Sequence, residues 1–262
     1  MHVHLPKPLH GWRAFVGEVG IIVLGVLIAL SAEQLVENLH EHYLADQAEK
    51  HIRAELAYNS AFAIERVAIG DCMRSSFSDL RQRLLASGDN WPGLQDRPLS
   101  GGARRSASGP LFAFVPVLSS PRRLWPTSAW AAATTSGALN RGHTRFFNYA
   151  ALYAMVDEFS RLQDHEVGDY SRLMPFEVPQ RLDASTRFQL FSALGAVDAD
   201  NAGMERLAAV FVTAAKRNGI RPDPRWLRLV FDEEIGGRGA CVKQGPALDA
   251  ALMREFNGDS RR

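Results

Sequence analysis

A single apolar run near the amino terminus constrains this chain more than any other stretch. Residues 14–32 read AFVGEVGIIVLGVLIALSA and carry one charged side chain, Glu18. As an α-helix, the run would be about 28 Å long. The hydrocarbon layer of a bilayer is about 30 Å thick. We therefore expect residues 14–32 to form a transmembrane helix.

The same run has some features of a cleaved export signal. Lys7 and Arg13 give it a basic start, and Ala29-Leu30-Ser31 resembles a small-residue cleavage site. However, the run is longer than the roughly 7 to 15 apolar residues of a signal core, and helix-forming sequence follows it without a break. The membrane anchor is the favoured prediction, and the cleaved signal is the alternative.

Charges on the two sides of the run predict its orientation. The tail of residues 1–13 contains Lys7 and Arg13 and no acidic residue, whereas Lys50 is the only Lys or Arg in residues 33–52. Basic residues are enriched on the cytoplasmic side of membrane helices. We expect a cytoplasmic tail and a single-pass anchor in the inner (cell) membrane. The rest of the chain would lie in the periplasm of a bacterium with two membranes.

One face of the expected membrane helix carries residues spaced by three and four, namely Glu18, Ile22, Gly25, Ala29 and Ala32. Gly25 and Ala29 form a small-xxx-small pair, which allows a second helix to approach closely in lipid, although small residues are also simply common in membrane helices. Glu18 lies within two turns of Arg13, so its carboxylate can reach the cytoplasmic head groups; the alternative is a buried functional acid. The face is a candidate surface for self-association.

Composition places the remaining chain among globular proteins. The chain has 262 residues, of which 46% are hydrophobic and 23% charged, so the part beyond the anchor can bury its own core. Thirty Lys and Arg against 29 Asp and Glu leave a net charge of +1. This balance gives no bulk attraction for nucleic acid, and we predict no nucleic-acid partner.

The chain has two cysteines, Cys72 and Cys241, and both follow the expected anchor. Two thiols are too few for a metal site built from cysteines. In an oxidising compartment they allow a single disulfide. We predict a Cys72–Cys241 bridge, with two unrelated buried thiols as the alternative.

Helical periodicity dominates beyond the anchor. Residues 33–69 contain no Pro or Gly, so we expect a helical stalk over residues 33–70 that is too irregular for a coiled coil. Gly70 and Asp71 should interrupt it before a helix over residues 72–87. Six more helices are predicted: from Thr127 or Ser128 to Ala138, from Thr144 past Leu162, from Asp183 or Ser185 past Leu194, from Met204 to Gly219, over 226–235 and over 246–256. No alternation of strands and helices occurs, so the fold class is all-α, with a periplasmic domain over 71–258.

Residues 88–126 depart from this pattern because they are rich in Gly, Pro, Ser and Arg, which is typical of an irregular loop. The strand-like stretch 111–118 contains Pro116, which restricts it to an edge or an extended segment. Loops of this length often bind or cover a ligand. A candidate anion-binding group in this loop consists of Arg104, Arg105, Arg122 and Arg123. Ordinary solvated arginines are the alternative.

The sequence contains no pattern that we can assign to a catalytic, cofactor or metal site. The three histidines of the tail have no fixed geometry. Residues 198–201, Asp-Ala-Asp-Asn, begin like a calcium loop, but Ala202 and Ala209 stand at two ligand positions. We interpret residues 198–201 as a helix start.

Three segments resemble a known family. They are residues 17–30, with Gly17-Glu18 before an apolar stretch that ends in Gly25-Val26-Leu27-Ile28-Ala29-Leu30; residues 53–59, Arg-Ala-Glu-Leu-Ala-Tyr-Asn; and Trp130 with Ser136-Gly137-Ala138-Leu139 and Leu152-Tyr153. In these segments the chain resembles a family of uncharacterised bacterial single-pass membrane proteins. Those proteins often carry Asn-Trp-Asn just past the anchor, where this chain has residues 32–35, Ala-Glu-Gln-Leu. The resemblance implies no activity, cofactor or catalytic residue.

Three classes of function remain open. The favoured one is a membrane-anchored, non-enzymatic protein whose periplasmic domain contacts another protein or itself. The second is a small-ligand sensor with a pocket lined by aromatic residues such as Trp125, Trp130, Phe147 and Tyr153. The third is a hydrolase. Converging titratable groups in a pocket would favour an enzyme, whereas an exposed apolar surface would favour a protein partner.

Overall fold

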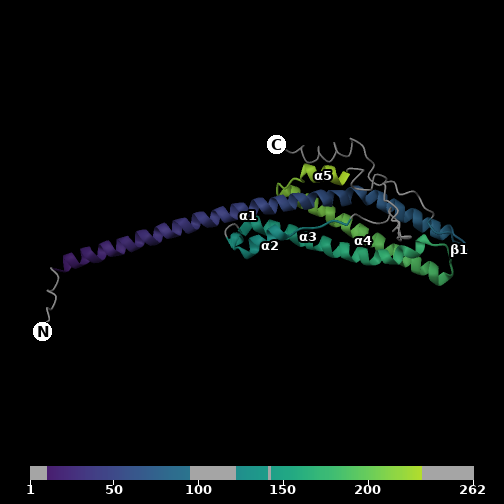
Figure 1. The fold of residues 1–262 in the computed structure, drawn as a ribbon, viewed down its shortest axis with the longest axis horizontal. Helices are drawn as coiled ribbons and strands as arrows, with labels where there is room; N and C mark the ends of the chain where they lie inside the picture. Colours follow the sequence, from purple (N-terminus) through teal and green to yellow (C-terminus); the bar gives the residue numbers. More distant parts are fainter. Residues whose placement is uncertain (1–10, 95–121, 141–142, 232–262) are drawn as a thin grey trace, which may run out of the picture.

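The structure is a computed structural model that describes residues 11–94, 122–140 and 143–231 (Figure 1). These residues form five α-helices, two short 3-10 helices and one pair of two-residue strands, so the all-α prediction is confirmed. The helix predicted over 246–256, the stretch 111–118 and most of the loop at 88–126 lie outside the described residues, as does the end of the predicted domain after residue 231.

Helix α1 (Gly11–Ala86) is a continuous helix of 76 residues, which corresponds to a length of about 110 Å. Its N-terminal part extends away from the rest of the molecule, and its C-terminal part lies within the domain (Figure 1). The predicted interruption at Gly70 and Asp71 is wrong. A Cβ built at Gly70 would collide with the carboxylate of Glu205 on α4. The missing side chain of Gly70 therefore leaves room for this carboxylate, and glycine is kept inside the helix despite a helix-propensity cost of about 1 kcal/mol.

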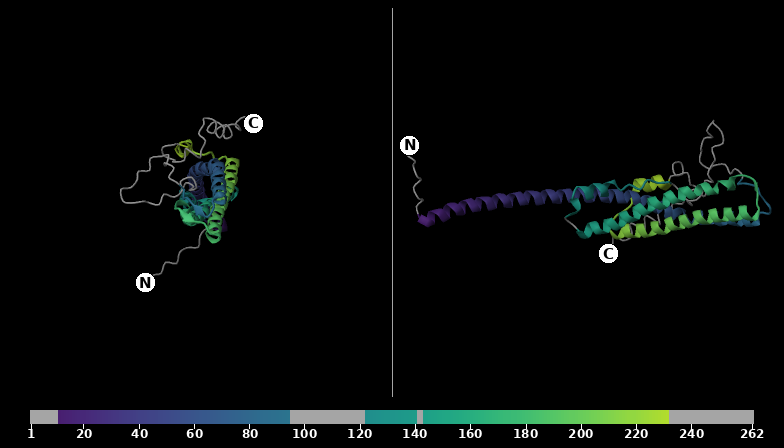
Figure 2. Two further views of the ribbon diagram at one scale, coloured as in Figure 1. Left: turned by 90° about the vertical axis from the view of Figure 1, so that its right-hand side faces the viewer. Right: turned by 90° about the horizontal axis from the view of Figure 1, so that it is seen from below.

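Two more long helices run beside the second half of α1: α3 (His143–Tyr170) and α4 (Ala184–Arg217) (Figure 2). The connection between them contains η2 (Ser171–Glu177) and strand β2 (Gln180–Arg181), which pairs antiparallel with β1 (Asn90–Trp91). Two shorter helices, α2 (Ser128–Thr135) and α5 (Pro224–Phe231), also pack on α1. The short η1 (Ala138–Asn140) follows α2.

Both ends of α4 follow the sequence prediction. The Asp183 side chain accepts a hydrogen bond of 2.7 Å from the backbone N–H of Thr186 and caps the first turn. Gly219 has φ +66° just after the last turn, where the N–H of Ile220 donates to the carbonyl of Ala215 at 3.0 Å. However, the two helices predicted here are one helix. Residues 198–201 lie in its interior, so their interpretation as a helix start is wrong.

The second half of α1 is the centre of the domain. Residues 59–66 are all buried, so α1 is covered on every side there. The predicted stalk at 33–70 therefore has two different halves: it is mostly exposed up to residue 51 and enters the core from Ile52 onward.

Candidate functional site: the anchor face and a polar layer

The anchor residues singled out in the sequence lie on the exposed part of α1. Among the described residues, α1 is the one helix long and apolar enough to cross a membrane, and none of its most apolar window is buried in the domain. Glu18, Gly25 and Ala29 are exposed, and a Cβ at Gly25 would meet no atom within 4 Å. The face is therefore open to a second helix.

This face continues beyond the expected membrane boundary. The seam, as we name it, consists of residues whose spacing alternates between three and four: Ile22, Gly25, Ala29, Ala32, Val36, Leu39 and Tyr43. The last three are large apolar side chains with exposed fractions of 66%, 63% and 60%. The pattern ends at Asp46, next to the first contacts of α1 with the core at Ala48. Sequence reasoning recognised the membrane part of the seam and missed its extension, although the spacing alone shows it.

The domain core is divided into two apolar clusters with polar residues between them. One cluster ends at Ala63 on α1, Phe159 on α3 and Met204 on α4. The other begins at Ile69 on α1, Tyr170 on α3 and Val197 on α4. The polar layer between them comprises Glu65, Arg66, Arg123, Gln163, Glu166, Asp169 and Asp200.

A fully desolvated ion pair crosses this layer. The Arg66 Nη2 of α1 lies 2.8 Å from the Glu166 Oε2 of α3, and the two side chains are 3% and 1% exposed. Such a pair adds little net stability compared with apolar residues, but either charge alone would be very costly in the same place. The pair therefore fixes how α1 and α3 face each other.

A second, partly buried ion pair fastens residues 122–127 to the helices. The Arg123 guanidinium donates from Nε and Nη2 to the two Glu65 carboxylate oxygens at 2.7 and 2.6 Å, and this hydrogen bonding raises the pKa of Arg123. Arg123 also lies over the ring of Phe62, 5.1 Å from its centroid. The Gln163 amide exchanges two hydrogen bonds of 2.9 Å with the Arg123 backbone. The Arg123 guanidinium is therefore already paired with a carboxylate of the protein itself.

The other members of the predicted anion-binding group are placed differently. Arg122 is exposed and lies 3.6 Å from the Asp164 carboxylate. Arg104 and Arg105 lie outside the described residues. The structure therefore gives Arg123 a part in the core and leaves an anion site at the other arginines as a prediction.

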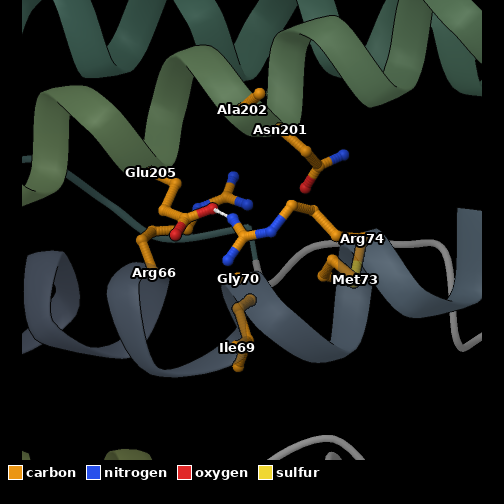
Figure 3. Close-up of a pocket in the computed structure, with 8 residues that line it drawn as sticks. All are labelled: Arg66, Ile69, Gly70, Met73, Arg74, Asn201, Ala202 and Glu205. Atoms are coloured by element: carbon orange, nitrogen blue, oxygen red, sulfur yellow. Dashed lines mark hydrogen bonds and ion pairs between the residues drawn. The ribbon is translucent and has the colours of Figure 1, made fainter.

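Titratable groups also converge where α1 meets α4 around Gly70 (Figure 3). Arg74 forms ion pairs with Glu205 of α4 and with Asp71 one turn away on α1, and Arg66 lines the same hollow. The hollow has room for about one water molecule. It is too small for an organic substrate, so these charges hold two helices together.

The aromatic residues expected to line a ligand pocket mostly fill the core. Trp125 stacks on Phe159 with ring centroids 4.2 Å apart, and Trp130 stacks on Tyr153 at 5.1 Å. The Tyr153 hydroxyl donates to Glu55 Oε1 at 2.7 Å, and burial together with this bond raises the pKa of Tyr153. Phe147 is 76% exposed. The aromatic faces that a ligand would use are thus covered or lie apart.

Glu55 also supplies the cap at the start of α2. Its carboxylate accepts hydrogen bonds from the Ser128 hydroxyl at 2.8 Å and from the Ala129 N–H at 3.0 Å. Thr127 occupies the N-cap position but makes no side-chain cap bond. The expected local cap is therefore replaced by a carboxylate from α1, which sequence spacing cannot reveal.

One polar group near the surface was not recognised in the sequence. The His165 Nδ1 lies 3.0 Å from the Asp200 Oδ2 and 3.9 Å from the Asp169 Oδ2. The hydrogen bond to Asp200 raises the pKa of His165. The pair His165 and Asp169 has the i, i+4 spacing of two ligands on one helix face, which was the available signal, but the partner on α4 follows only from tertiary structure.

Cys72 lies on α1 and is not a free thiol in the structure. Cys241 lies outside the described residues. The disulfide between these two cysteines therefore stays a prediction.

Comparison of the chain with models of protein families, with curated proteins and with solved structures finds no match. The resemblance to the family of single-pass membrane proteins accordingly stays an expectation from the sequence.

Proposed function

We propose that this chain is a membrane-anchored, non-enzymatic protein that holds a helical periplasmic domain at a set distance from the cell membrane, for contact with a protein partner. The observation that carries this proposal is the continuity of α1. One helix contains the exposed apolar run and, further along, the fully enclosed residues 59–66. Between Glu33 and Ile52 it spans about 28 Å. An anchor of this kind positions a domain and requires no catalytic site.

The position and orientation of the anchor are tested with the full chain. A reporter that is active only outside the cytoplasm, fused after Arg262, should be active, because Lys7 and Arg13 hold the tail in the cytoplasm. The double change Glu33→Lys and Glu37→Lys should reduce this activity, whereas Glu33→Gln with Glu37→Gln should preserve it. Activity of a cytoplasm-only reporter at the same site would contradict the orientation. An alkaline-soluble product that begins near Ser31 would show a cleaved signal instead.

The partner that the seam supports best is a second copy of the chain. Two copies in one membrane share their orientation, so each seam residue meets its own counterpart in a parallel pair. Inside the bilayer the small residues allow close approach. Outside it, pairing would remove the exposed Val36, Leu39 and Tyr43 side chains from water. The seam would therefore favour association of two chains both inside the bilayer and just outside it.

The change Gly25→Ile should weaken self-association about tenfold, because a branched side chain would separate the two helices at their closest point. Gly20→Ile is the matched control, since Gly20 is equally open but lies on the opposite face of the helix. Energy transfer between labelled chains in lipid vesicles measures the self-association of both variants. Equal effects of the two changes, or no transfer in the unchanged protein, would remove the seam as an interface.

A further inference from the structure

The group His165, Asp169 and Asp200 combines residues from two packed helices, and its two aspartates belong to the polar layer. His165 and Asp169 lie one turn apart on α3, and Asp200 faces them from α4. The three side chains together offer one imidazole nitrogen and two carboxylate oxygens within 4.8 Å of one another. Imidazole nitrogens and carboxylate oxygens are both ligands that zinc takes in proteins.

The distances fit a small tetrahedral ion. Ligand atoms bound to zinc at about 2.1 Å are about 3.4 Å apart in a tetrahedral arrangement. The His165 Nδ1 lies 3.0 Å from Asp200 and 3.9 Å from Asp169. These two distances bracket the tetrahedral value, and all three ligand atoms lie within 4.8 Å of one another, so rotation of the side chains would bring them around one ion.

The charges and the burial of the group favour a dication. The Asp169 and Asp200 side chains are only 9% and 13% exposed, whereas His165 is 67% exposed. Arg172 lies 3.1 Å from the Asp169 Oδ1, so Oδ2 is the oxygen that faces the imidazole. A divalent ion would bring positive charge to two largely desolvated carboxylates, of which Asp169 also pairs with Arg172.

We propose that His165, Asp169 and Asp200 bind a zinc ion through His165 Nδ1, Asp169 Oδ2 and a carboxylate oxygen of Asp200. The fourth ligand position would face solvent on the side of the exposed imidazole and would hold water. The ion would tie α3 to α4 at the edge of the polar layer. Because it would bind the folded state and find no such set in the unfolded chain, it would stabilise the domain.

The test uses the metal-free full chain in detergent, with the three histidines of the tail replaced by alanine so that they cannot bind zinc. Titration with zinc chloride should give one site per chain by calorimetry and should raise the melting temperature. Cobalt in place of zinc should give the intense visible absorption of a tetrahedral site. His165→Ala and Asp200→Asn should each weaken zinc binding at least tenfold, since loss of an outer-shell partner alone costs about 10- to 100-fold.

Two controls make the outcome decisive. His51→Ala removes another exposed histidine, and Asp164→Asn removes an exposed carboxylate on the same helix as His165; both should leave zinc binding unchanged. Asp200→Asn keeps the shape of the side chain, and its melting temperature without metal shows whether it folds. Absence of zinc binding in the unchanged site, or equal binding in the His165→Ala variant, would overturn the proposal.

Discussion

Replacing Glu166 with Gln is expected to lower the free energy of unfolding by about 3–5 kcal/mol. The change leaves the Arg66 guanidinium at the same place, where it is 3% exposed and 2.8 Å from the position of the lost charge. A buried charge without its counter-ion retains its full cost of desolvation. Denaturant unfolding of the full chain in micelles, followed by tryptophan fluorescence, measures the loss because Trp125 lies in the neighbouring cluster.

Two controls separate burial from simple loss of charge. Asp79→Asn breaks the exposed i, i+4 pair with Arg83, whose side chains are about half exposed, and should cost less than about 1 kcal/mol. The double change Arg66→Met with Glu166→Leu removes both buried charges and should restore much of the stability that Glu166→Gln loses. A loss from Glu166→Gln as small as that from Asp79→Asn would show that water reaches the Arg66 site.

The second large effect is expected for Phe159→Ala, which should also cost about 3–5 kcal/mol. The Phe159 ring is fully buried, stacks on Trp125 and meets Phe211 edge to face at a centroid distance of 5.7 Å. Its removal leaves a cavity that these rigid neighbours cannot close. The same denaturant titration measures this loss.

Phe147→Ala is the matched control, because Phe147 lies on the same helix and is 76% exposed. It should change the stability by no more than about 0.5 kcal/mol. Similar small effects for both phenylalanines would indicate a loose aromatic region, and the ligand-pocket alternative would then regain support.

The parts of the fold that depend on local chemistry could be predicted from the sequence. The apolar run, the cap at Asp183 and the end at Gly219 each follow from residue types within a few positions. The all-α class follows from periodicity over longer stretches. These features need no knowledge of what packs against them.

The predictions that were wrong concern residues whose structure depends on contacts with distant parts of the chain. Gly70 reads locally as a helix breaker, yet its missing side chain makes room for Glu205 on another helix. Residues 198–201 read as a start, yet Asp200 turns toward His165 of α3 inside a continuous helix. Arg123 belongs to an arginine-rich loop in the sequence, but Glu65, 58 positions away, holds its guanidinium. In each case a contact between segments far apart in the sequence decides the local structure or the role of the residue.

The unbroken course of α1 also has a mechanical consequence. A helix without a hinge transmits torsion, so a turn of the anchor about its own axis is passed along α1 toward the Arg66 side chain. Glu166 on α3 cannot follow unless the whole domain turns too, because the pair joins separate helices through a short, desolvated contact. In the proposed membrane setting, pairing of two anchors along the seam would therefore set how each domain is rotated about the axis of α1. This rotation decides the direction in which the outer surface of the domain faces.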